Sequence, residues 1–211
     1  MKDAAITDSC RLCAVINGTR VHGVADKPII ETANFVVIPS IGGFIEGWSM
    51  IVPKEHVYDM SSFYGSEEFI TLVAAVYSRV EKAYGPLIMF EHGASYSGSP
   101  TGCGVDHAHF HFVPSPQSLS PALKASGRLW RYCEAKDIAS ISKAKDYLFY
   151  SDTSPITSKL AGHLHIVEEP VSQFFRRLLA ELTNNQDSSD YKAHPFIENA
   201  HRTAQTLFTV A

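Results

Sequence analysis

Three histidines alternate with apolar residues in one short segment, His107-Ala108-His109-Phe110-His111-Phe112. Successive side chains of an extended strand point to opposite faces, so the alternation predicts a β-strand with three imidazoles on one face and an apolar row on the other. The apolar row needs a hydrophobic layer to cover it. Because the chain holds only ten histidines, three in step rarely arise by chance, and we expect the histidine face to carry the function.

Composition limits the class of protein that contains this strand. Hydrophobic residues make up 45% and charged residues 19% of the 211 positions, as in an ordinary folded domain and unlike disordered, collagenous or coiled-coil chains. The formal net charge of -4 provides no general positive field, so nucleic acid is not an expected partner. No apolar run reaches the ~18 residues of a membrane helix. The first ten residues lack an apolar signal core, and we expect a soluble cytoplasmic protein without membrane contact.

The first half of the chain predicts an antiparallel sheet with one helix. Residues 34–40 and 44–53 are rich in β-branched and aromatic side chains and are joined by Ile41-Gly42-Gly43, which is typical of a hairpin. Apolar residues recur every three or four positions over 66–84, which predicts an amphipathic helix ending at Gly85-Pro86. Residues 87–93 predict another strand, and a loop of small residues over 95–104 leads into the histidine strand.

A polar, proline-containing segment after Pro114 marks a break in the chain. Beyond it, residues 146–152 and 162–167 predict short strands, and residues 170–182 and 194–208 predict amphipathic helices. We therefore expect an α+β fold with an antiparallel sheet of about five strands and a packed helix. The predicted core spans residues 1–114, and residues 115–211 form a mainly helical C-terminal extension packed on it. No internal sequence repeat is found.

Two kinds of chemistry use histidines placed in this way. Imidazoles from one strand bind zinc when a carboxylate or another histidine completes the coordination. Alternatively, one neutral imidazole attacks phosphorus directly while its neighbours orient it and neutralise the developing charge. The adjacent loop Gly102-Cys103-Gly104 offers backbone amides to a phosphate group, and the flanking sequence favours the second chemistry.

The flanking sequence resembles a known family. The run HAHFHFV matches the motif of the histidine triad family of nucleotide hydrolases and transferases, and GWSMIVPKEHV resembles the family's strand ending in Pro-Lys-x-His. The order of motifs also agrees, from an early Cys-x-x-Cys to the triad, and the resemblance covers about residues 8–114. The tail SQFFRRLLAEL followed by HPFIENAHRTAQTL is similar to the C-terminal extension of a bacterial branch of that family.

The resemblance implies a fold of the histidine triad type and a role for each triad residue. His109 would be the nucleophile that accepts a nucleoside monophosphate, His111 would contact phosphate oxygens, and His107 would complete the triad. Family members that transfer nucleotides carry Gln at the third position, so His111 favours hydrolysis of a phosphoanhydride or phosphoramidate. The alternatives are a nucleotidyltransferase or phosphorylase with the same intermediate, a non-catalytic nucleotide-binding sensor, and a hydrolase with the triad itself bound to metal.

The loop of small residues over 95–104, called the phosphate loop below, departs from the family pattern. Many members carry a Gln shortly before the triad, whereas this chain has hydroxyl, glycine and cysteine residues there. We expect Ser99, Thr101, Gly102 and Cys103 to replace it in nucleotide binding, together with His92 from the preceding strand. The alternatives are ordinary loop polarity for Ser99 and Thr101 and a hydrogen-bonded sheet position for His92.

Cys10 and Cys13 have the spacing of a zinc-binding pair, which needs two further ligands. In zinc-bearing members of the resembled family these are the histidine of Pro-Lys-x-His and the first triad histidine, here His56 and His107. The implied zinc is structural, and no organic cofactor is expected. Unmetallated thiols and a redox pair are the alternatives, the latter disfavoured because no helix N-terminus is predicted before residue 10.

Two features of the second half have alternative roles at the level of sequence. His163 and His165 alternate with apolar residues, which indicates either a half-exposed strand or a degenerate second motif. Near the start of a predicted helix lie Gln173, Arg176 and Arg177. Their position indicates either a phosphate clamp or ordinary surface polarity. The resemblance also implies a homodimer, and the small-molecule nucleotide is the expected partner.

Overall fold

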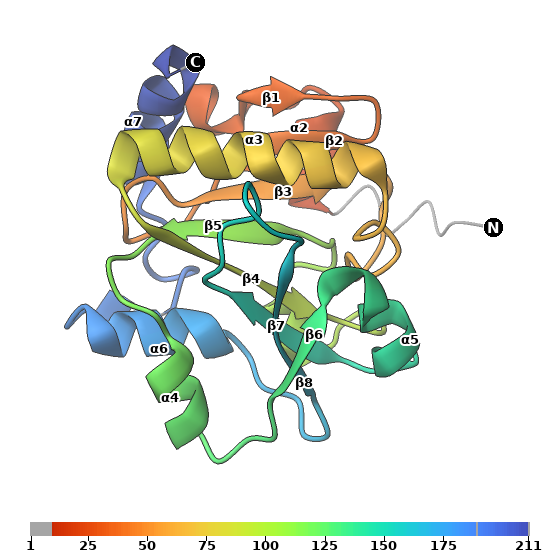
Figure 1. The fold of residues 1–211 in the computed structure, drawn as a ribbon. Coiled ribbons are helices and arrows are strands. Elements are labelled where there is room, and N and C mark those ends of the chain that lie inside the picture. The colour runs from red at the N-terminus through yellow and green to blue at the C-terminus, as the bar shows by residue number, and fades with distance from the viewer. Residues whose placement is uncertain (1–9, 189, 211) are drawn as a thin grey trace.

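The computed structural model describes residues 10–188 and 190–210. It is an α+β fold whose described part contains eight strands and six α-helices, with the strands in a single antiparallel sheet of order β1-β2-β3-β5-β4-β7-β8-β6 (Figure 1). The predicted α+β class is confirmed, whereas the expected number of about five strands is too low. Residues 1–9, on which the prediction about a signal core depends, lie outside the described part.

The N-terminal core contributes five strands and two α-helices. The strands are β1 (Ile30–Glu31), β2 (Phe35–Pro39), β3 (Ser49–Pro53), β4 (Leu87–Gly93) and β5 (Phe110–Pro114), and the helices are α2 (Arg11–Ile16) and α3 (Glu67–Tyr84). Short 3-10 turns occupy Gly23–Asp26 and Pro100–Gly102. The Ser66 side chain caps α3 by accepting from the Phe69 amide, and Gly85 ends it at a φ of 84°, so the prediction of this helix is confirmed.

The predicted hairpin is correct in its pairing and wrong in the start of its second strand. β2 and β3 pair from Phe35 opposite Pro53 to Pro39 opposite Ser49, so the connection runs over residues 40–48. Phe44 is apolar because it packs against the hydrophobic cluster beside Trp48, not because it belongs to a strand. Gly47 is required there, since a Cβ at this position would lie 2.6 Å from the Pro114 side chain.

The C-terminal region extends the same sheet. It contributes strands β6 (Arg131–Glu134), β7 (Tyr147–Ser151) and β8 (Ala161–Ile166), together with helices α4 (Ser120–Ala125), α5 (Ile138–Ser142), α6 (Phe174–Leu182) and α7 (Ile197–Thr209), and 3-10 turns at Ala135–Asp137 and Gln186–Ser188. The two predicted strands and two predicted long helices of this half are confirmed. The extension is richer in strand than expected, because it supplies three of the eight strands.

The connectivity of the first half is repeated in the second. β3, α3, β4 and β5 follow one another along the chain, and β5 lies between β3 and β4 in the sheet; β6, α5, β7 and β8 follow in the same way, and β8 lies between β6 and β7. The two halves meet where β4 pairs with β7. β8, which carries His163 and His165, therefore occupies the position in its half that β5 occupies in the first.

The sheet has a hydrophobic cluster on each face. Figure 1 shows α3 lying across the strands, and its apolar residues pack with Phe110, Phe112 and Phe149 into the larger cluster. On the opposite face, α6 packs Phe175 and Leu179 against Trp48 and Phe90, while α2 covers a third cluster around Met50. The histidine face of β5 lies on this second side, between α2 and α6.

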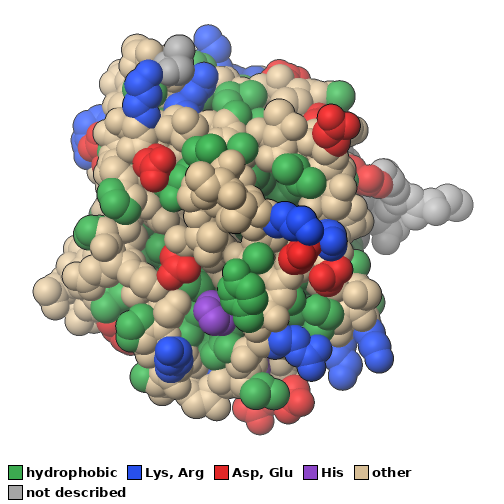
Figure 2. All heavy atoms as spheres, viewed as in Figure 1, with side chains coloured by type: hydrophobic (Ala, Val, Ile, Leu, Met, Phe, Trp, Pro, Cys, Tyr) green, Lys and Arg blue, Asp and Glu red, His purple; other side chains and the backbone are tan. Residues whose placement is uncertain are grey.

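Charged side chains of both signs are interspersed over the face of the molecule that Figure 2 shows, in keeping with the formal net charge of -4. Within residues 10–188 and 190–210, none of the helices combines the length and hydrophobicity needed to cross a bilayer.

Candidate active site

The triad histidines lie where the chain enters β5. The strand begins at Phe110, so His111 belongs to it while His107 and His109 precede it. Ala108, Phe110 and Phe112 nevertheless pack into the cluster under α3, which leaves the three histidines on the other side. The predicted division into an apolar row and a histidine row is confirmed, although the regular strand is shorter than expected.

A single hydrogen bond fixes the tautomer of His109. Its Nδ1 lies 2.8 Å from the carbonyl oxygen of His107, and because a carbonyl only accepts, Nδ1 carries the proton. Nε2 of the neutral ring therefore keeps its lone pair, and His109 lines a pocket on the histidine side of the sheet. Burial lowers the pKa of His109, which favours the neutral ring.

His111 holds the opposite tautomer. The Trp48 indole donates from Nε1 to His111 Nδ1 over 3.0 Å, and because indole N–H is only a donor, the ring proton of neutral His111 is on Nε2. The His109 and His111 ring centroids are 4.6 Å apart. Burial lowers the pKa of His111 well below its usual range. The pair thus presents an unprotonated nitrogen on one ring and an N–H donor on the next.

The pocket is walled by both halves of the chain. Leu12, Ser40, Ile41 and Met50 come from the core, and Gln173, Arg176 and Tyr191 come from the C-terminal region. His92 also lines it, and its side chain is only 7% exposed. The Phe175 amide donates to His92 Nε2 at 3.3 Å, and burial lowers the pKa of His92 to about 3, so this ring is a neutral part of the wall.

The phosphate loop is held internally. Ser99 is buried and donates to Asp146, and Thr101, also fully buried, does not line the pocket. The amides of Gly102 and Cys103 donate to carbonyls within the turn, which differs from the expectation of amides open to a phosphate. Cys103 does line the pocket, where its Sγ accepts from the Gln173 amide at 3.1 Å and burial raises its pKa to about 12.

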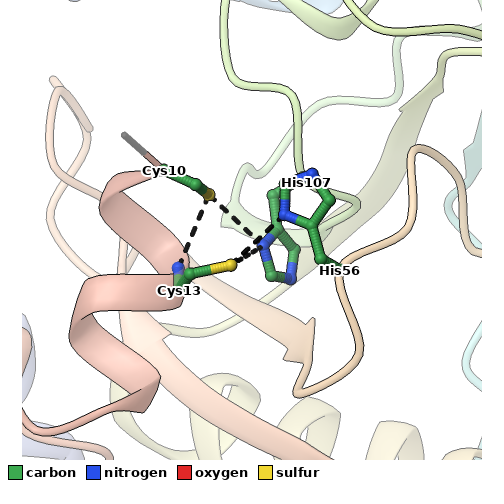
Figure 3. A group of neighbouring side chains, drawn as sticks. All are labelled: Cys10, Cys13, His56 and His107. Carbon is green, nitrogen blue, oxygen red and sulfur yellow. Dashed lines mark hydrogen bonds between the residues drawn. The ribbon is translucent and has the colours of Figure 1, made fainter. Parts of the chain in front are cut away.

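Cys10, Cys13, His56 and His107 converge on one point, as Figure 3 shows. Their ligand atoms all lie within 4.8 Å of one another. Cys13 Sγ is 3.2 Å from His56 Nδ1 and 3.4 Å from His107 Nδ1. His107 donates from Nε2 to the Pro53 carbonyl at 2.8 Å, which turns the lone pair of Nδ1 toward the thiols. Two thiols and two imidazoles, of which His107 is oriented by a backbone carbonyl, form a donor set suited to zinc.

The cysteine pair lies on a helix that the sequence analysis did not predict. Cys10 is the N-cap of α2, and Cys13 lies in its first turn, so the argument against a redox pair from a missing helix N-terminus does not hold. Burial raises the pKa of the Cys13 thiol to about 12, however, which opposes the thiolate that redox chemistry requires. Within the described residues, no other group of three or more potential ligands gathers in this way.

Several pocket residues escaped the sequence analysis. Trp48 and Tyr191 gave no signal beyond aromatic character, and Ser40 lies in the predicted hairpin. Gln173 and Arg176 were noted from their position near a helix start, and both line the pocket; Arg176 is only 6% exposed, whereas Arg177 is exposed. His165 is buried and bonded to Leu129 and Arg128, while His163 is partly exposed on the same strand.

Comparison with known proteins gives one curated relative. The chain is 28% identical over 108 residues to the adenosine 5'-monophosphoramidase hnt1 of Schizosaccharomyces pombe. The matched region covers 51% of this chain and 75% of the yeast protein. No protein-family profile matches the chain.

Proposed function

Because the chain belongs to the histidine triad family, we propose that it is a nucleotide hydrolase in which His109 carries the nucleoside monophosphate between two displacement steps. The observation that carries the proposal is the bond from His109 Nδ1 to the His107 carbonyl. It holds a neutral imidazole with its unprotonated Nε2 in a pocket, as a nucleophile toward phosphorus requires. The homology to the yeast phosphoramidase supports a phosphorus–nitrogen bond as the bond that breaks.

In the first step, His109 Nε2 attacks the 5'-phosphorus and the bond to the leaving amine breaks, with a proton from solvent water supplied to the departing nitrogen. In the second step, water attacks the same phosphorus and releases a proton to solvent, the bond to Nε2 breaks, and the nucleoside monophosphate leaves. His111 donates its Nε2 hydrogen to a phosphoryl oxygen in both steps, which neutralises the charge that develops there. A phosphoanhydride follows the same course with an oxygen leaving group.

Zinc has a structural role in this proposal. Cys10, Cys13, His56 and His107 would hold the ion and tie α2 to the segment that leads into β5. Because His107 is the only triad residue in this group, His109 stays outside the coordination sphere. The triad as a complete metal site is therefore disfavoured by the geometry.

The alternative reaction, transfer of the nucleotide to phosphate or a sugar phosphate, shares the first step with hydrolysis. Product analysis with and without these acceptors distinguishes the two reactions. A non-catalytic sensor would bind nucleoside monophosphate without forming the intermediate. His111 at the third triad position supports hydrolysis over transfer, through the family pattern described above.

Mass spectrometry of the trapped intermediate tests the proposal. The protein is mixed with adenosine 5'-monophosphoramidate and a panel of other nucleotides, quenched in the linear phase, digested and searched for a nucleoside monophosphate adduct. We expect the adduct on His109 and its absence in His109→Ala. His163→Ala is the matched control, because His163 lies on the corresponding strand of the second half and should leave the adduct intact. An adduct on another residue, or turnover that survives His109→Ala, would refute the mechanism.

A further inference from the structure

The C-terminal region closes the pocket over the triad. Gln173 begins this wall, where its backbone amide donates to Cys103 Sγ at 3.1 Å. Farther along, the Gly42 amide donates to the Pro195 carbonyl at 2.5 Å, and the Asn199 side chain donates to the Gly43 carbonyl at 3.1 Å. The first contact fastens the start of α6 to the loop before the triad, and the other two fasten residues 195–199 to the loop between β2 and β3. The pocket is therefore completed by residues of the C-terminal region.

Arg176 is the buried cation of this wall. Its guanidinium lies 5.1 Å from the Phe44 ring centroid and 5.4 Å from that of Trp48. Its Nη2 donates to the carbonyls of Gly42 and Ser188, the latter at 3.0 Å. Cation–π contacts with two aromatic rings and hydrogen bonds to two carbonyls hold the group in place. Trp48 is also the residue that bonds to His111, so the cation and the triad share a neighbour.

The pocket lining is positively charged. Two arginines and no acidic residue are found among the described residues that line it. Arg11 is already paired with Asp26 at 2.5 Å, which neutralises its charge locally. Burial lowers the pKa of Arg176 to about 10, still far enough above neutrality for the side chain to remain charged. A buried cation of this kind favours an anionic ligand over a neutral one, because solvent screens their attraction weakly.

We propose that Arg176 is a substrate-binding residue that recognises the phosphate of the nucleotide held at His109, so that the C-terminal region supplies part of the active site. The inference rests on the proposed function for the identity of the ligand. It gives the extension a chemical role. In the phosphate loop, the Ser99 hydroxyl donates to Asp146 and the amides of Gly102 and Cys103 donate within their own turn. A guanidinium from α6 therefore supplies charge and donors that these loop groups do not offer.

The competing explanation is that Arg176 only fastens α6 to the loop at Gly42. Both explanations predict lower stability when the side chain is changed, so stability alone does not separate them. They differ in the ligand. If Arg176 only holds α6 in place, its substitution changes the affinity for a nucleoside and for its monophosphate alike. If Arg176 binds phosphate, the substitution lowers only the affinity for the monophosphate.

Calorimetric titration with adenosine 5'-monophosphate and with adenosine separates the two. We expect Arg176→Gln to weaken binding of the monophosphate about 10- to 100-fold, as the loss of a charge-assisted contact does, with little change for adenosine. Arg176→Lys, which keeps the charge and loses the fork, should fall between. Arg177→Gln is the matched control, since the neighbouring arginine is exposed, and should bind both ligands as the unchanged protein does.

The outcomes separate this inference from the proposed function. If the unchanged protein forms the His109 adduct and Arg176→Gln binds both ligands with equal loss or no loss, the role of Arg176 is refuted and the function stands. If the unchanged protein forms no adduct and binds no monophosphate, the function itself fails. Should Arg176→Gln not fold, the ratio of the two affinities in Arg176→Lys decides, and an unchanged ratio overturns the inference.

Discussion

Each triad ring is bonded to a group that can only donate or only accept a hydrogen bond. That partner determines which ring nitrogen carries the proton. The carbonyls of Pro53 and His107 accept from His107 and His109, and the Trp48 indole donates to His111. As a result the three rings carry their protons on Nε2, Nδ1 and Nε2 in turn. In the proposed mechanism, this alternation gives the first ring a lone pair for metal, the second a lone pair for phosphorus and the third a donor for a phosphate oxygen.

Trp48→Phe tests the last of these assignments. Phenylalanine keeps an aromatic ring beside Phe44 and Phe90 and removes the donor to His111, which then samples both tautomers. The smaller ring also changes the contact with Arg176, so the tautomer is measured directly. We expect kcat/KM to fall about 3- to 10-fold, as the loss of one hydrogen bond does. The 15N chemical shifts of His111 should change from one tautomer to a mixture. A fall in rate with an unchanged tautomer would place the effect elsewhere.

The stability of the fold also depends on one buried acid. Glu91 in β4 is fully buried. Its carboxylate accepts from the Met60 amide and the Tyr147 hydroxyl, each at 2.6 Å, and from the Tyr64 hydroxyl. Gly93 permits this arrangement, because a Cβ there would lie 2.3 Å from the Tyr147 ring. Burial, with nearby Asp59, raises the pKa of Glu91 from 4.5 to about 8.

The pH dependence of unfolding follows from this shift. A pKa that is higher in the folded state means that the folded protein binds the proton more tightly, so stability is fully present below about pH 4.5, declines as pH rises, and levels off above about pH 8. Glu91→Gln has no such titration. We expect the unfolding free energy of the unchanged protein, relative to this variant, to fall between pH 5 and pH 8 in urea titrations. Parallel pH profiles would contradict the assignment.

At the scale of elements, the four-residue cluster joins α2 to the end of β3 and the entrance of β5. Cys10 and Cys13 belong to the helix, His56 follows β3 and His107 precedes β5. A bound metal would therefore hold the short helix against the sheet, since six residues are too few for a helix to be stable alone.

We expect about one zinc per chain by elemental analysis, and none after both Cys10 and Cys13 are changed to Ser. The melting temperature should fall by about 5–10 °C, which for a chain of this size corresponds to ~2–4 kcal/mol. Cys133→Ser is the matched control, because Cys133 lies on β6 outside the cluster, and should keep its zinc. Full metal content in the double variant would rule out this site.

Elements with a complete local pattern were predictable. The helix α3 has apolar spacing, a serine cap and a terminal glycine, and β4 begins with a run of four apolar residues. The beginning of β3 was not predictable, because Phe44 and Trp48 owe their burial to the distant α6. The helices α2, α4 and α5 span only five or six residues, too few for a periodicity to show.

The candidate site divides in the same way. The metal-binding set could be predicted through resemblance because its members lie in three short sequence motifs, and the structure brings those four side chains together. The pocket could not be predicted, because its walls depend on contacts between residues more than a hundred positions apart, such as Arg176 with Gly42. Periodicity carries no information about such pairs.

At the scale of the molecule, the second half of the sheet covers what would otherwise be an edge. β7 pairs with β4 over five positions, so a core that stopped at Pro114 would leave β4 unpaired, and exposed strand edges promote association. A homodimer, which the resemblance implies, could therefore not form by pairing at this edge of β4.

Both halves also share their cores, which bears on the proposed division at Pro114. Phe110 and Tyr64 pack with Phe149, and Phe90 packs with Phe175 at 4.8 Å between ring centroids. Neither half buries its apolar face alone. We therefore propose that residues 1–114 and 115–211 are two segments of one cooperative unit, although only the first carries the triad.

The two tryptophans make this cooperativity measurable, because Trp48 lies in the first segment and Trp130 in the second. Trp130→Phe leaves Trp48 as reporter, and Trp48→Phe leaves Trp130. Since both indoles pack in or against the same hydrophobic cluster, loss of either segment should expose the other. In each variant, we expect the fluorescence and circular dichroism transitions in urea to share one midpoint. A first transition sensed only by Trp130, with Trp48 still native, would show that the core folds without the extension, and the pocket wall built by α6 would then be a separable addition.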